Sequence, residues 1–156
     1  MQGVDRMDVH ILRLIQENAS RSTADIAEQV GLSQNACWRR VRLLEEHGYI
    51  RKRVALLDAK KLGVGMTVFV TVRAAEHTDE WLREFAAIVD QLPEVMEFYR
   101  MTGDIDYLIK LQVADIDAYD RVYKTLIRSI RLTDLSGSFA MEAIKQTTAI
   151  PLPTFD

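Results

Sequence analysis

Residues 33–53 read SQNACWRRVRLLEEHGYIRKR, and this stretch decides how the first third of the chain folds. Ser33 is a suitable N-cap, because its hydroxyl can accept a hydrogen bond from an amide in the first turn of a helix. Gly48 suits the left-handed residue that follows a helix. Between the two, the stretch predicts a helix of about four turns with one narrow apolar stripe. The stripe consists of Cys37, Val41, Leu44 and, one step round the helix, Leu43.

The opposite face of this predicted helix is polar and basic. It carries Gln34, Asn35, Arg39, Arg40 and Arg42. Amide and guanidinium groups near the start of a helix suit contacts with DNA base edges and phosphates. The alternative is a solvated surface helix, because a charged face carries little information without its context.

That context lies in the flanking residues. STADIAEQV at 22–30 predicts a short helix that begins with a capping box, and Gly31 starts a three-residue turn. Residues 5–16 predict an earlier helix capped by Asp5. Helix, glycine turn and polar-faced helix form the helix-turn-helix pattern, so the DNA interpretation outweighs the alternative. The following residues, Tyr49, Ile50, Arg51, Lys52 and Arg53, predict a basic wing strand along the phosphate backbone.

The formal net charge of the 156 residues is −3, but the charges are segregated along the chain. Residues 1–61 hold 11 Lys or Arg against 8 Asp or Glu, whereas the remainder holds 9 against 15. The positive field therefore coincides with the predicted reading helix. The acidic remainder is expected to form a second domain.

The cysteine and histidine content limits the chemistry that the chain can perform. A single cysteine, Cys37, excludes a disulfide framework, and the three histidines share no metal-ligand spacing, so no metal site is predicted. Cys37 is interpreted as a core residue, with a redox-sensing thiol as the alternative. The charged N-terminus is unlike a signal peptide, and no apolar run approaches the roughly 18 residues that span a bilayer. We expect a cytoplasmic protein with no membrane partner.

From residue 64 the hydrophobic period changes to two, which predicts a strand through Met66 to Val72. Helices are predicted after the caps Thr78 and Asp115, and further strands over 95–102, 107–113 and 135–148. The second of these helices is expected to pack through Ile116, Tyr119, Tyr123, Leu126, Ile127 and Ile130. This order is that of a ferredoxin-like βαββαβ fold, in which both helices cover one face of an antiparallel sheet.

We therefore predict an α+β protein with two domains. A winged helix-turn-helix domain occupies 1–53, a structured hinge 54–63, and a ferredoxin-like αβ-sandwich domain 64–156. Large apolar side chains occupy both odd and even positions of the predicted strands, for example Phe69 with Val70 and Phe98 with Tyr99. Both faces of the sheet are therefore apolar, which indicates that the uncovered face is buried against a second copy. Such a dimer predicts a palindromic operator with half-sites about 34 Å apart or a multiple of it.

At this point several ordered motifs indicate a family. They are VDRMDVHILRLIQENAS, IAEQVGLSQNACWRRVRLLEEHGYI, VALLDAKKLG, MTGDIDYLIKLQV and SFAMEAIKQTTAIPL. Through them the chain resembles the Lrp/AsnC (feast/famine) transcription regulators over essentially its whole length. The resemblance implies a bacterial or archaeal nucleoid-associated regulator of amino-acid metabolism. It also implies a ferredoxin-like domain that dimerises, assembles further, often to an octamer built as a tetramer of dimers, and binds an amino acid between dimers.

The resemblance also implies site residues. The DNA-contacting set is Ser33, Gln34, Asn35, Arg39 and Arg40, to which Arg51, Lys52 and Arg53 add phosphate contacts. The effector set is Gly103, Asp104, Asp106, Tyr107, Ile116, Ser138, Phe139 and Ala140. Ordinary turn chemistry is the alternative for the two aspartates. No cofactor beyond an amino-acid effector is implied.

One departure from the family pattern borders the effector region. Many members have a Leu-Pro-Gly-Val-like turn after the second helix, whereas this chain reads SIRLT at 129–133. Arg131 therefore joins the effector set, as a residue that reshapes the pocket or binds a carboxylate. Several segments resemble most closely the branch with regulators of cysteine detoxification, which makes cysteine one candidate effector beside leucine and methionine.

Two other functions compete with that of a regulator. An enzyme on a ferredoxin-like scaffold needs a nucleophile or an acid–base set, and no such constellation or phosphate loop occurs in the sequence. No catalytic residue is predicted. An effector-insensitive architectural protein that coats DNA would have the same fold and would differ by its broad sequence tolerance.

Overall fold

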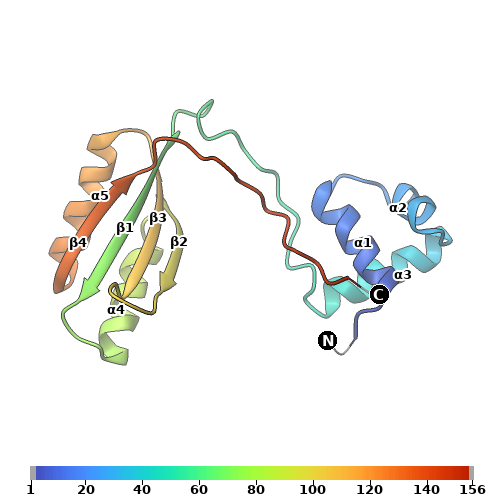
Figure 1. The fold of residues 1–156 in the computed structure, drawn as a ribbon, viewed down its shortest axis with the longest axis horizontal. Coiled ribbons are helices and arrows are strands. Elements are labelled where there is room, and N and C mark those ends of the chain that lie inside the picture. The colour runs from blue at the N-terminus through green and yellow to red at the C-terminus, as the bar shows by residue number, and fades with distance from the viewer. Residues whose placement is uncertain (1–2, 155–156) are drawn as a thin grey trace. The chain divides into compact units, whose positions relative to one another are not determined.

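The computed structural model describes residues 3–154 as two compact units (Figure 1). The first unit comprises the described residues up to Leu56 together with those from Lys145 onward, and the second is Leu57–Ile144. The C-terminal segment joins the first unit through the side chain of Gln16, whose amide exchanges two hydrogen bonds of 3.1 and 3.2 Å with the backbone of Ile150. The predicted ferredoxin-like domain, 64–156, includes this segment, because nothing local in the sequence indicates a partner 134 residues away.

The first unit contains three helices, α1 (Arg6–Glu17), α2 (Thr23–Val30) and α3 (Gln34–Glu46). Asp5 and Ser22 form capping boxes with Asp8 and Asp25. Gly31 ends α2 at a φ of 70°, the left-handed region that an L side chain adopts at a cost. The three helices enclose a core that includes Ile11, Ile26, Cys37, Val41 and Leu44. The predicted helix-turn-helix pattern is confirmed.

Two expectations for the first unit were wrong. Leu43 is half exposed and does not extend the buried stripe of α3, because a narrow stripe at 3.6-residue periodicity accommodates Cys37, Val41 and Leu44 but not their neighbour. Within residues 3–154, no strand forms between the end of α3 and residue 65. The predicted wing at 49–53 is therefore not a strand in the single chain, since no segment of the described chain pairs with it.

The predicted hinge is structured at its C-terminal end. The Asp58 side chain accepts hydrogen bonds from the amides of Lys60 and Lys61 at 3.0 and 3.1 Å, and Gly63 has a φ of 76°. This is an Asx-type turn, in which a carboxylate satisfies backbone donors that would otherwise bind water.

The second unit has the predicted ferredoxin-like topology. Its elements are β1 (Met66–Ala74), α4 (Asp79–Asp90), β2 (Val95–Arg100), β3 (Tyr107–Val113), α5 (Ile116–Ser129) and β4 (Leu132–Phe139). The strands form one antiparallel sheet in the order β2-β3-β1-β4. The last strand, predicted at 135–148, begins earlier, because Leu132 already pairs with Ala74 of β1. It also ends earlier, because β1 provides no partner residues before Met66.

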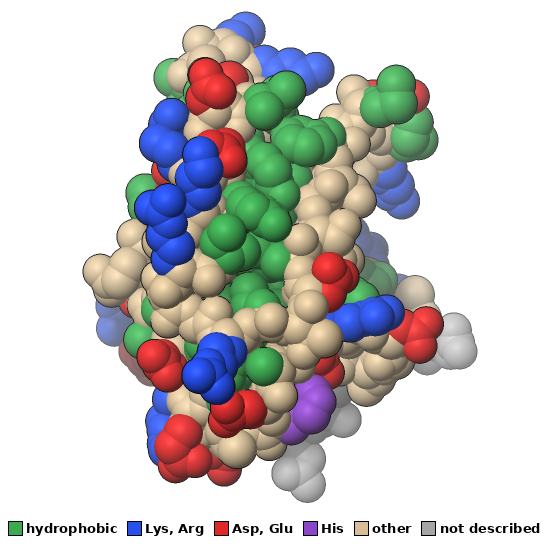
Figure 2. Space-filling view, turned by 90° about the vertical axis from the view of Figure 1, so that its left-hand side faces the viewer, with side chains coloured by type: hydrophobic (Ala, Val, Ile, Leu, Met, Phe, Trp, Pro, Cys, Tyr) green, Lys and Arg blue, Asp and Glu red, His purple; other side chains and the backbone are tan. Residues whose placement is uncertain are grey.

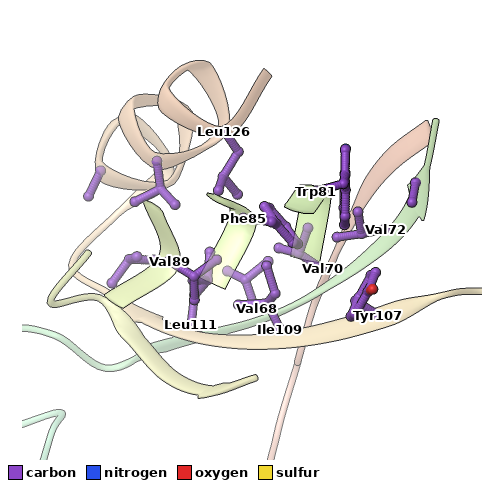
Figure 3. Packing of buried hydrophobic residues seen from close by; sticks show 14 residues of the cluster. Val68, Val70, Val72, Trp81, Phe85, Val89, Tyr107, Ile109, Leu111 and Leu126 are labelled. Carbon is purple, nitrogen blue, oxygen red and sulfur yellow. The ribbon is translucent and has the colours of Figure 1, made fainter. Parts of the chain in front are cut away.

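The core of this unit lies between the sheet and its two helices (Figure 3). Alternate residues of β1, Val68, Val70 and Val72, meet Phe85 from α4 and Leu126 from α5. Each of these five side chains is 1% exposed or less, and such burial stabilises the fold by about 1.5–3 kcal/mol per side chain.

The packing face of α5 differs from the prediction. Leu126 is buried, and Tyr119 and Ile130 pack against the core, as predicted, whereas Ile116 and Ile127 are exposed. The buried face also includes Ala118 and Val122. Tyr119 also faces β4, where the centre of its ring lies 5.0 Å from the centre of the Phe139 ring. Figure 2 shows a band of hydrophobic side chains along the face of the molecule that carries α5 and β4. The residues of the predicted stripe therefore lie partly against the sheet and partly in solvent. A hydrophobic period shows that one side of a helix is apolar, but it does not show which part of that side meets the sheet.

Candidate nucleic-acid interface and ligand pocket

The outward face of α3 is free to contact a ligand. Gln34, Asn35 and Arg39 are exposed, and no carboxylate within residues 3–154 pairs with Arg39. Ser33 has a structural role at the start of the helix, where its hydroxyl accepts a hydrogen bond from the Ala36 amide at 3.3 Å. The N-terminal half of α3 therefore presents two amides and a guanidinium from a rigid, capped helix, which is the chemistry that DNA base edges accept.

Arg40 is oriented differently from its neighbour Arg39. Its Nη1 donates hydrogen bonds of 2.8 Å both to Asp5 and to Asp8, at the start of α1. A hydrogen bond from the Asp8 amide lowers the pKa of Asp5 below its ordinary value, and the bond from Arg40 lowers it further. Arg40 therefore ties α3 to α1.

Trp38 is not among the residues that the sequence predicts to contact DNA. Its side chain lies on α3 one turn after Asn35 and is 54% exposed. The guanidinium of Arg42 lies 5.7 Å from the centre of the Trp38 ring and also pairs with Glu46 at 3.0 Å. Its place in the sequence could have indicated this exposure, because residue 38 falls outside the buried stripe of Cys37, Val41 and Leu44.

The basic run after α3 is exposed. Arg53 pairs with Glu45 at 3.1 Å, whereas Arg51 and Lys52 have no carboxylate partner among the described residues. Unpaired cations beside a reading helix suit phosphate contacts.

A pocket in the second unit lies beside the GDIDYL turn. Its lining is His77, Thr78, Asp79, Leu82, Arg100, Met101, Asp106 and Tyr107. One carboxylate oxygen of Asp106 accepts the Ala74 amide at 2.8 Å, and the other lies 3.8 Å from Nδ1 of His77. Sequence reasoning missed His77 and Arg100, which the sheet brings to Asp106 without any local signal. The pocket places the guanidinium of Arg100 and the carboxylates of Asp79 and Asp106 in one lining, and such opposite charges complement the two charges of a zwitterion.

The predicted effector residues fall into two groups. The turn residues Gly103, Asp104, Asp106 and Tyr107 lie at one end of β1, where Tyr107 pairs with Val72. Arg131 lies near this end, since its carbonyl accepts the indole N–H of Trp81, which stacks on Tyr107. Phe139 pairs with Val68, four residues along β1 and roughly 13 Å away, and Ser138 and Ala140 adjoin it. Ile116 starts α5, and its side chain is 64% exposed. A single chain therefore does not gather the predicted set around one small ligand.

Two family profiles match the chain. The one described as Lrp/AsnC ligand binding domain matches residues 67–150, and the one described as winged helix-turn-helix DNA-binding matches residues 4–51. The chain belongs to the Lrp/AsnC family. Its members are DNA-binding transcriptional regulators. These matches confirm the predicted fold and the predicted family.

Individual Lrp/AsnC relatives agree with this assignment. The glutamate uptake regulatory protein of Zymomonas mobilis is 55% identical over 98% of this chain and 93% of its own. The crystal structure of an AsnC family regulator from Agrobacterium tumefaciens matches this chain with a TM-score of 0.91. The two sequences are 52% identical, and the match covers 95% of this chain and 97% of the other. A regulator from Neisseria meningitidis, solved as an L-Met complex, is 33% identical, with a TM-score of 0.90 over 96% and 97% of the two chains.

The described residues of this Lrp/AsnC chain include neither a candidate metal site nor a candidate membrane-spanning helix. No three His, Cys, Asp or Glu side chains among residues 3–154 come together as a metal site. No helix in that range is long and apolar enough to cross a bilayer.

Proposed function

We propose that this Lrp/AsnC protein is a sequence-specific transcriptional regulator of amino-acid metabolism whose DNA affinity or assembly responds to a small amino acid. The observation that carries the proposal is the exposed outward face of α3, with Gln34, Asn35 and Arg39 presented from a capped helix. The second unit, which matches a ligand-binding domain profile, supports the effector part.

On the DNA side, α3 enters the major groove and reads base edges, while the basic run after it contacts phosphates. Ser33, Gln34, Asn35 and Arg39 form the reading set, together with any contact that Arg40 makes beyond its two carboxylates. Arg51, Lys52 and Arg53 supply sequence-independent affinity. Removing one phosphate contact should therefore reduce the slope of log affinity against log salt by about 0.9.

On the effector side, the two separated groups of predicted residues act together only across an interface between copies. One copy supplies Gly103, Asp104, Asp106, Tyr107 and Arg131, and another supplies Ile116, Ser138, Phe139 and Ala140. The L-Met complex of the Neisseria relative supports an amino-acid effector, and the name of the Zymomonas relative points to amino-acid supply. Cysteine, leucine and methionine remain the candidates, cysteine through the proposed likeness to the cysteine-detoxification branch.

The assembly that this requires is a dimer and, above it, a tetramer of dimers. The open face of the sheet supports dimerisation, because Phe69 and Tyr99 leave apolar surface in water there. A dimer places two copies of α3 on one duplex, which predicts a palindromic operator. The protein acts in the cytoplasm, on nucleoid DNA.

A thermal-shift screen of the full-length protein against the twenty amino acids tests the effector part. A ligand that binds only the folded state raises the apparent stability by an amount that grows with its concentration over its Kd, about 2.7 kcal/mol at a hundredfold excess. We expect one or two amino acids to raise the melting temperature. The same amino acids should change the affinity for DNA in an anisotropy titration.

The choice of variant matters in this screen. Asp106→Ala would orphan the Ala74 amide, so a lost response would not distinguish binding from folding. Arg131→Ala keeps the backbone carbonyl that Trp81 uses, and Arg128→Ala on the same segment is the matched control. We expect the first variant to lose the response and the second to keep it. No response of the wild type to any amino acid, with broad sequence tolerance on DNA, would favour the architectural alternative.

A further inference from the structure

The two tryptophans of the chain lie in opposite environments. Trp81 is 5% exposed, stacks on Tyr107 and donates its indole N–H to a carbonyl at 3.0 Å. Trp38 is 54% exposed, and no acceptor within residues 3–154 lies against its indole N–H. A tryptophan side chain has a large apolar area, and burial of its exposed part in an interface would contribute favourable free energy.

The position of Trp38 on α3 places it inside the reading face. Asn35 lies three residues before it and Arg42 four residues after it, which are the spacings of neighbours on a helix surface. The ring therefore stands between an amide that suits an adenine and a guanidinium that is paired with Glu46. Its solvated area continues the surface that the DNA would cover.

Arg42 holds the ring from one side. Its guanidinium lies 5.7 Å from the ring centre, and Glu46 fixes that guanidinium through a bond of 3.0 Å. An aromatic ring restrained in this way loses little further entropy when it is buried, which favours its use as a rigid contact.

We propose that Trp38 is a specificity-determining residue that reads thymine, through contact of its ring with the C5-methyl group in the major groove. The thymine methyl is the apolar feature that a base pair shows in this groove, and an apolar side chain is its complement. This inference rests on the proposed function, since it assumes that α3 enters the groove.

The test uses full-length protein and a duplex that the wild type selects from random DNA. Each thymine of the duplex is replaced in turn by uracil, which lacks only the methyl group, and affinity is measured by fluorescence anisotropy at constant salt. With the wild type, replacement of one or two particular thymines weakens binding roughly fourfold each, the value for one buried methyl-sized group. In Trp38→Ala, overall affinity falls tenfold or more, and those replacements have no further effect.

Two controls separate reading from folding. Trp38→Phe keeps an apolar ring and should retain part of the sensitivity to uracil. Met96→Ala removes an equally exposed apolar side chain from β2 and should bind like the wild type. The melting temperature of Trp38→Ala should stay within a few degrees of the wild type, because surface changes are usually small.

Three results distinguish the outcomes. If Trp38→Ala binds the selected duplex as tightly as the wild type, Trp38 lies outside the interface and the proposal is wrong. If the variant loses affinity but stays as sensitive to uracil as the wild type, the ring contacts the backbone and methyl reading is wrong. If the wild type selects no duplex at all, the proposed DNA function itself fails.

Discussion

Two adjacent arginines of α3 have different partners, and this difference decides what each one does. Arg39 points outward without a carboxylate partner among residues 3–154, whereas Arg40 donates to Asp5 and Asp8 on α1. Asp8 is buried, with its side chain 12% exposed. Substitution of Arg40 would therefore leave a carboxylate that is desolvated and lacks its cation.

Arg40→Ala should lower the free energy of unfolding of the first unit by about 1–3 kcal/mol, the cost of leaving a buried charged group without its hydrogen bond. Arg39→Ala is the matched control, because it removes the same charge from the next residue. It should leave stability within about 0.5 kcal/mol of the wild type and weaken DNA binding instead. Urea unfolding followed by circular dichroism measures the first effect, and anisotropy the second. Equal stability of the two variants would show that the pairing with α1 contributes nothing.

The same cluster predicts a pH dependence. The Asp8 amide, assisted by Arg40, lowers the pKa of Asp5 below its ordinary 3.8. A carboxyl with a lowered folded-state pKa stabilises the protein above its unfolded pKa, and this stability is lost as the pH falls through the folded value. The difference in melting temperature between wild type and Asp5→Asn should therefore shrink below about pH 4. A difference that stays constant from pH 7 to pH 2 would contradict the assignment.

Cys37 is a core residue of α3. It is fully buried, and this burial raises the pKa of its thiol. A buried neutral thiol is a poor nucleophile, because the thiolate is the reactive form. Native protein should therefore react with a disulfide reagent such as DTNB only as fast as it unfolds, and denaturant should restore a full equivalent of reaction. Rapid labelling of the native protein would revive the redox-sensing alternative.

At the scale of elements, α5 and β4 approach each other closely at Gly137. A Cβ at this position would lie 2.2 Å from the Tyr119 hydroxyl oxygen and 2.7 Å from Cζ of the same ring. The backbone there needs no positive φ, so glycine is required by space and not by conformation. The space left by Gly137 lets the ring of Tyr119 lie against β4.

Gly137→Ala should destabilise the second unit by about 1–3 kcal/mol, because the ring of Tyr119 must move off β4. Ser136→Ala is the control on the same strand, since its side chain is exposed and its carbonyl still accepts the Thr71 hydroxyl. Thermal unfolding compares the two. Tyr119→Leu in the Gly137→Ala background should recover part of the loss, and a failure to recover any would remove the steric explanation.

At the scale of the whole molecule, the proposed function requires copies to associate. The open face of the sheet presents Phe69, 38% exposed, beside a network in which Glu97 accepts from Lys110 at 2.7 Å and Tyr99 at 2.6 Å. An interface there would bury the ring against its counterpart.

Phe69→Glu should convert the assembly to smaller species, because it places a carboxylate in the interface while Lys110, the cation opposite it on β3, is already paired with Glu97. Leu62→Glu places the same charge on an exposed apolar residue of the hinge turn and should leave the mass unchanged. Light scattering after size exclusion measures the mass of each. An unaltered mass for Phe69→Glu would move the interface away from the open sheet face.

The sequence alone is enough for features such as helix caps and a strand period, which depend on residues within about four positions of one another. The caps Asp5, Ser22, Ser33, Thr78 and Asp115, the turn at Gly31 and the strand period of β1 are all where they were predicted. Hydrogen bonds of this range need only the local chain, so the elements, their order and the family follow directly.

Tertiary structure alone decided what depends on distant partners. Only packing turned Arg40 toward α1 and left Trp38 exposed, although both belong to one polar helix. Only the sheet register separated Phe139 from Tyr107 and brought Arg100 and His77 to Asp106. The physical reason is that a side chain pairs with a group that folding brings within reach. The spacing of residues along the sequence does not show which group that will be.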